Sequence, residues 1–192
     1  MFPIRGRLDL LQSELWVDLS AEELYSHNQV RLAFTCTLGR LARATDEGLY
    51  CVAGMRWSDL AVALSVQPDA LFIRYNSLRT GVVQLVATSD GDYDEITGTP
   101  DMVLEVVSAS SVTRDTVRLR ELYWRAGVPE YWLVDARGAT PRFDALHRGA
   151  KRYVATRRQT GWTASAVFGR RFRLTRQADP LGQPRYVLSV QP

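Results

Sequence analysis

Lysine is almost absent from this 192-residue sequence, and cysteine is scarce. Lys151 is the only lysine among the 24 basic residues, so arginine carries nearly all of the positive charge. The planar guanidinium group of arginine suits the geometry of phosphate groups. A compositional bias of the genome explains the excess of arginine over lysine more simply. The two cysteines, Cys36 and Cys51, lack the spacing of a metal site, and we expect reduced thiols in the cytoplasm.

Long apolar runs are also missing. No segment approaches the ~20 apolar residues that a membrane span requires, and the N-terminal segment lacks the apolar core of a secretory signal. A net charge of +3 is too small for a protein that coats DNA. Hydrophobic residues make up 46% of the chain, enough to build the core of a single domain.

The most informative stretch begins with a single acidic residue in an apolar run. Residues 102–107 are apolar except for Glu105, and a run rich in Val and Leu is typical of a strand that is buried on both faces. An unpaired buried charge is very costly. We therefore expect Glu105 to be paired, protonated or bound to a metal.

A helix and a second strand are predicted after this run. Serines supply candidate N-caps for the helix, and Gly127 stands where a C-cap glycine belongs. Residues 131–134 form another strand-like run, which indicates a βαβ unit with a parallel strand pair. The apolar stripe of the helix is formed by Leu119, Leu122, Tyr123 and Ala126.

Further elements are predicted before this unit. Ser20 and Glu23 have the spacing of a capping box, which predicts a helix from there to about Ala44. Asp69 stands at the head of an apolar strand, where it is either a turn residue or a carboxylate that works with Glu105. Other strand-like runs lie at residues 49–57, 60–66 and 82–87.

Short strand-like pieces after Asp135 predict a small antiparallel meander. We divide the single domain, residues 1–192, into an N-terminal arm (1–19), a core (20–135) and a C-terminal β extension (136–192). The pieces of the meander are residues 142–147, 152–157, 163–168 and 172–175.

The order of these elements resembles the core of the PD-(D/E)XK nucleases. The resemblance implies an α/β fold, a restriction-endonuclease-like mixed sheet flanked by helices. Within these nucleases, the sequence most resembles the Uma-type family of restriction endonucleases, and the resemblance covers residues 20–175. The matching features are residues 98–108 and 127–135, His27, Pro68-Asp69, Gly161-Trp162 and Phe172-Arg-Leu.

This resemblance implies a metal-dependent hydrolysis of phosphodiesters. Asp69 and Glu105 would hold Mg²⁺, or Mn²⁺ in its place, and DNA would be the substrate. Asp101 lies four residues before Glu105 and can share its face of the strand, so it is either a further catalytic ligand or a turn residue. A homodimer fits the need of many nucleases to cut two strands.

One position departs from the family pattern. The family's lysine lies on the helix, four residues after an aspartate and four before a tyrosine; Asp115 and Tyr123 match, but Leu119 stands between them. The neighbours Arg118 and Arg120 are each turned by about 100° around the helix. Loss of a positioned acid or base costs on the order of 10²–10⁴ in rate. The sequence thus predicts a weakened nuclease, or alternatively an inactive module for nucleic-acid binding or assembly.

Overall fold

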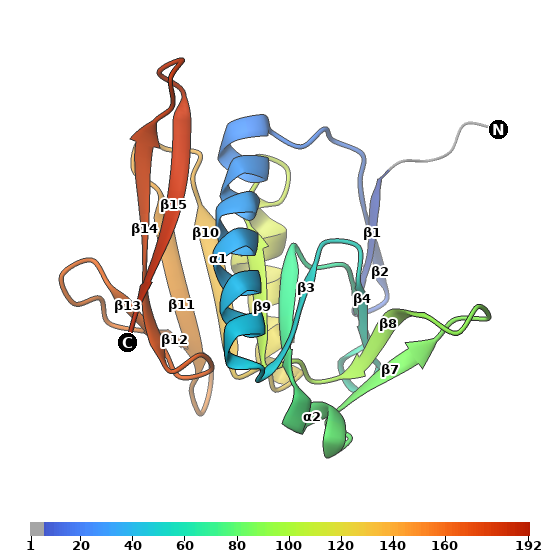
Figure 1. Cartoon of the computed structure of the whole chain (residues 1–192). Helices are drawn as coiled ribbons and strands as arrows, with labels where there is room; N and C mark the ends of the chain where they lie inside the picture. The colour runs from blue at the N-terminus through green and yellow to red at the C-terminus, as the bar shows by residue number, and fades with distance from the viewer. Residues whose placement is uncertain (1–5) are drawn as a thin grey trace.

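The computed structural model describes residues 6–192, which form three β-sheets with helices packed between and beside them (Figure 1). A mixed six-stranded sheet lies at the centre, in the order β12-β11-β10-β9-β6-β3. Strands β9 and β10 are parallel, as the predicted βαβ unit requires. The bounds of the six are β3 (Gly48–Val52), β6 (Ala70–Arg74), β9 (Met102–Val106), β10 (Glu130–Asp135), β11 (Arg142–Arg148) and β12 (Tyr153–Ala155).

The second sheet also has six strands, in the order β2-β1-β5-β4-β8-β7. Residues 7–18, which were expected to be an arm, form its β1–β2 hairpin, and β1 pairs with β5. The predicted arm also includes residues 1–5, which lie outside the described part of the chain. The strands are β1 (Arg7–Leu11), β2 (Glu14–Asp18), β4 (Arg56–Asp59), β5 (Leu64–Val66), β7 (Val83–Ala87) and β8 (Tyr93–Gly98).

The first helix is shorter than predicted at its N-terminal end, whereas the second predicted helix begins directly after the predicted cap serines, where the Ser111 N–H donates to Ser108 Oγ. The capping-box prediction is wrong: the first helix starts after Glu23 without a side-chain cap, because the Ser20 hydroxyl donates to Asp18 instead. None of the described helices is both long and apolar enough to cross a bilayer. The helical segments are η1 (Leu24–Gln29), α1 (Val30–Thr45), η2 (Leu60–Val62), α2 (Tyr75–Arg79), η3 (Arg114–Arg118) and α3 (Leu119–Arg125).

The central sheet is covered on both faces, so all five residues of β9 are buried, as predicted. On one face, apolar residues of α1 pack with β14 and β15 against the sheet. On the other face, the stripe of α3 packs with the second sheet. Gly127 ends α3 with a φ of 87°, and its N–H donates to the carbonyl of Trp124, which confirms the predicted C-cap.

The predicted C-terminal antiparallel meander is present, but it does not include all of the strands after Asp135. β11 and β12 extend the central sheet, whereas β13 (Thr163–Ser165), β14 (Arg170–Ala178) and β15 (Pro184–Gln191) form a third sheet. Buried Glu130 on β10 ties this sheet to the centre, because its carboxylate accepts hydrogen bonds from Ser165 Oγ and from the N–H of Val167. The chain therefore crosses between sheets after β12.

Candidate active site

The structure brings Asp69 and Glu105 to the same end of two adjacent strands. β6 and β9 are antiparallel with Ala70 opposite Leu104, so the next pair along the register is Asp69 and Glu105. Oδ2 of Asp69 accepts a 2.7 Å hydrogen bond from the N–H of Val106. This bond holds the Asp69 carboxylate against the last residue of β9.

Glu105 is fully buried on the face of β9 that is covered by α3. Tyr123 Oη donates to Oε1 at 2.7 Å, and Arg7 Nη2 donates to both carboxylate oxygens at 3.2 Å. Burial raises the pKa of Glu105 to about 7, against the attraction of Arg7 and with repulsion from Asp115 and Asp69. The existing cations therefore do not fully offset the cost of burying this carboxylate.

Asp69 is buried too, but its surroundings favour the ionised form. His27 Nε2 lies 3.5 Å from Oδ2, and Arg31 Nη1 lies 3.7 Å from Oδ1. Burial alone would raise the pKa of Asp69, but the contact with His27 and the charge of Arg7 lower it below its ordinary value. With Nε2 turned toward Asp69, buried Nδ1 of His27 has no hydrogen-bond partner in the described part of the chain.

The N-terminal hairpin supplies part of this site, which the sequence interpretation missed. Asp9 is buried, and its Oδ2 accepts a 2.9 Å hydrogen bond from Arg114 Nη1. Arg114 Nε donates at 2.8 Å to Asp115, which is also buried. Asp9 lies between Leu8 and Leu10 in the chain. The same pattern, a charged residue within an apolar run, singled out Glu105. The sequence could therefore have indicated Asp9 as well.

Negative charge is in excess in this buried cluster. Two guanidiniums, Arg7 and Arg114, face four carboxylates, and Arg31, which also contacts Asp69, is shared with Glu22. Burial raises the pKa of Asp115 as well, against the attraction of Arg114. The four buried carboxylates are Asp9, Asp69, Glu105 and Asp115.

A divalent cation would balance this excess. Within residues 6–192, no three or more His, Cys, Asp or Glu side chains are arranged to hold a metal. A cation between Asp69 and Glu105 would thus complete its shell with water, which is how Mg²⁺ commonly binds through one or two carboxylates. The donor set fits magnesium and offers none of the soft ligands that select other metals.

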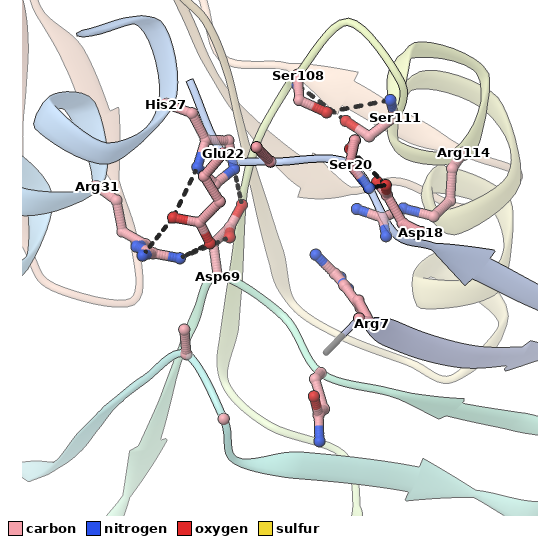
Figure 2. Close-up of a pocket in the computed structure, with 15 residues that line it drawn as sticks. Arg7, Asp18, Ser20, Glu22, His27, Arg31, Asp69, Ser108, Ser111 and Arg114 are labelled. Carbon is pink, nitrogen blue, oxygen red and sulfur yellow. Dashed lines mark hydrogen bonds and ion pairs between the residues drawn. The ribbon is translucent and has the colours of Figure 1, made fainter. Parts of the chain in front are cut away.

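A pocket of about 360 Å³ opens beside Asp69 (Figure 2). His27, Arg31 and Asp69 line one side, Arg114 lines the other, and Arg7 reaches in from β1. Three guanidiniums around one pocket suit an anionic ligand such as a phosphodiester, although Asp18, Glu22 and Asp69 line the same pocket and place negative charge there too. Fully buried Glu105 lies behind Arg7.

Two roles were predicted for Asp101, a further catalytic ligand or a turn residue, and its contacts favour the turn residue. It precedes β9, at the opposite end of the strand from Glu105, and its Oδ2 accepts from the N–H of Arg74 and from Ser77 Oγ, both at 2.8 Å. These bonds fasten the start of α2. The structure does not bring Asp101 to the Asp69–Glu105 pair.

The residues around the missing lysine also have structural roles. Leu119 is fully buried in the core beside α3 and does not plug the pocket. Arg118 pairs with Glu14, and Arg120 donates to the Tyr153 carbonyl at 3.4 Å. The positive charges beside Glu105 are therefore those of Arg7 and Arg114, in place of a lysine at position 119.

Comparisons with known proteins agree with this architecture. No curated protein matches the chain. A solved structure from Anabaena variabilis, titled a "putative nuclease belonging to DUF820", shares the fold with a TM-score of 0.63 at 10% identity, covering 84% of this chain and 83% of its own. Residues 4–177 match the model of a family described as "Putative restriction endonuclease". The match spans most of the chain and confirms the resemblance: the protein belongs to the Uma2 family.

Proposed function

We propose that this protein is a metal-dependent endonuclease that hydrolyses phosphodiester bonds in DNA. The observation that carries the proposal is the pairing of Asp69 with Glu105 in a cluster that buries more carboxylates than cations. Membership of the Uma2 family supports it, because the description of that family is "Putative restriction endonuclease". Three arginines among the pocket residues support an anionic substrate, with Asp18, Glu22 and Asp69 on the same lining left to a cation or to the arginines.

Asp69 and Glu105 would hold the Mg²⁺ ion, and Mn²⁺ would serve in its place. When bound, the ion would polarise the phosphodiester and lower the pKa of a coordinated water. Arg31 and Arg114 line the pocket and would bind the phosphate oxygens. His27, which contacts Asp69 through Nε2, is a positioning residue for that carboxylate.

A plasmid-nicking assay in Mg²⁺ or Mn²⁺ tests this function. We expect nicking by the wild type and a loss of at least about 100-fold in Glu105→Gln, which keeps the shape of the side chain but not its charge. Glu121→Gln is the matched control, because Glu121 is an exposed carboxylate paired with Arg125. Equal nicking by the wild type and Glu105→Gln would contradict the proposal.

A second candidate is a nuclease fold without catalysis, which binds nucleic acid or serves in assembly. It is favoured by Leu119 at the lysine position, although this side chain leaves the pocket open. DNA binding that weakens steeply with salt, without any cleavage, would support this candidate. A lack of binding even at low salt would leave only the assembly role.

The expected homodimer and the cytoplasmic location remain predictions. Pairing of two copies would allow cleavage of both DNA strands, and light scattering of the purified protein measures the mass directly. The structure places Cys36 and Cys51 as free cysteines, and free thiols suit a reducing compartment. Cell fractionation would test the location.

A further inference from the structure

Arg7 lies between Glu105 and the pocket. Its guanidinium donates to both oxygens of Glu105, and the side chain is 20% exposed whereas Glu105 is fully buried. Figure 2 shows Arg7 entering the pocket from β1, between the Asp69 side and the Arg114 side. Arg7 therefore stands between the pocket and Glu105, and Arg114, which also lines the pocket, lies 3.9 Å from the same carboxylate.

The two arginines of the cluster differ in their freedom to move. Arg114 is held on two sides, by Asp9 and by Asp115, and is itself buried. Arg7 Nε lies 3.0 Å from Asp9 but makes no hydrogen bond with acceptable geometry to any described residue. The hydrogen bonds that hold the Arg7 guanidinium are thus those to Glu105, and the ion pair with Asp9 anchors its Nε end. Release of Glu105 leaves Arg7 facing the pocket.

We propose that Arg7 supplies the positive charge that the family's lysine provides elsewhere, and that it competes with the divalent cation for Glu105. With the cation absent, Arg7 is the counter-ion of Glu105. With the cation present, Arg7 releases the carboxylate and contacts the phosphodiester in the pocket. This inference rests on the proposed function.

Binding of Mn²⁺ alone, followed by electron paramagnetic resonance, separates this role from a structural one. We expect Arg7→Ala to bind Mn²⁺ about 10- to 100-fold more tightly than the wild type, because one charge-assisted competitor is gone. The same variant should nick plasmid at least about 100-fold more slowly, because the charge that faces the phosphate is lost. If the role of Arg7 were only structural, Arg7→Ala would lower both the Mn²⁺ affinity and the nicking rate.

Two further variants complete the test. Arg7→Lys keeps the charge but cannot span both oxygens, so it should bind Mn²⁺ more tightly than the wild type and nick faster than Arg7→Ala. It also serves if Arg7→Ala fails to fold, as judged by circular dichroism. Arg125→Ala is the matched control, since this exposed arginine pairs with Glu121 away from the pocket, and it should change neither measurement.

The outcomes distinguish the proposed role of Arg7 from the proposed nuclease function on which it rests. If the wild type binds Mn²⁺ and nicks plasmid while folded Arg7→Ala and Arg7→Lys bind Mn²⁺ no more tightly, the competition is overturned and the nuclease proposal stands. If neither the wild type nor the Arg7 variants bind Mn²⁺ or nick plasmid, the proposed function is overturned and the inference with it.

Discussion

The hydroxyl of Tyr123 donates a 2.7 Å hydrogen bond to Oε1 of Glu105, and both side chains are fully buried. This bond joins the middle of α3 to the central strand β9. Leu119 lies one turn earlier on the same helix face and contributes only apolar contact. The helix thus takes part in the site through its tyrosine, not through the position where the family has a lysine.

Replacing Tyr123 with phenylalanine should destabilise the fold. At pH 8, where Glu105 is ionised, a hydrogen bond to this charged group is worth about 1.5–3 kcal/mol, and its loss leaves a buried carboxylate short of one donor. Tyr153→Phe is the matched control, because the buried Tyr153 hydroxyl donates at 2.8 Å to the neutral carbonyl of Val128. Urea unfolding should show the larger loss for Tyr123→Phe. Equal losses would mean that Glu105 needs no donor there.

The stability of metal-free protein should fall as the pH rises. Burial raises the pKa of Glu105 from an ordinary 4.5 to about 7, so between these values the folded state binds a proton that the unfolded chain has released. The stabilisation is complete below the unfolded pKa and is lost as the pH rises through the folded pKa. At pH 8 the loss would be roughly 3 kcal/mol.

Urea midpoints in EDTA between pH 5 and 8.5 measure this slope. Glu105→Gln is neutral, so it should flatten the slope and be the more stable protein at pH 8. The pKa of His27 is raised by Asp69 against burial, which gives a slope of the same sign. Subtracting the two profiles therefore removes the contribution of His27 and leaves that of Glu105 together with its coupling to Asp115 and Asp69. Parallel profiles would show that Glu105 titrates as in the unfolded chain.

The effect of a lysine at position 119 on stability should depend on whether Arg7 is present. Leu119 stands one helical turn from Asp115 and one from Tyr123, and both residues belong to the buried cluster. Alone, Leu119→Lys buries a third cation beside Arg7 and Arg114 and should destabilise the fold. Combined with Arg7→Ala, the lysine replaces the lost charge, so we expect a favourable coupling of about 0.5–3 kcal/mol.

The double variant should also nick plasmid faster than Arg7→Ala alone. Leu119→Met, with and without Arg7→Ala, controls for the change of side-chain shape in the core. Thermal unfolding of the four proteins in each cycle measures the coupling. Purely additive effects would show that position 119 does not reach Glu105.

Asp101 should matter for stability but not for metal binding. It accepts hydrogen bonds from the Arg74 N–H and the Ser77 hydroxyl, so Asp101→Asn should cost about 1–3 kcal/mol. Binding of Mn²⁺ by the folded variant should be unchanged, in contrast to Asp69→Asn. A folded Asp101→Asn protein that no longer binds Mn²⁺ would make Asp101 a ligand after all.

The sequence by itself determined the elements whose signals are local. An apolar run interrupted by Glu105, a helical stripe and the cap at Gly127 predict β9, α3 and β10 because burial and backbone geometry act within a few residues. It also predicted that Asp69 heads the neighbouring strand, since β6 begins directly after it. The family resemblance rests on these same segments.

Only the tertiary structure decided which charges surround Glu105. Arg7 is 98 residues away in the chain, and Asp9 is 105 residues from Arg114. No periodicity encodes contacts over such separations, because they depend on how the N-terminal hairpin packs against β9 and η3. The division of the C-terminal strands between two sheets has the same cause: strand propensity favours pairing but does not choose the partner.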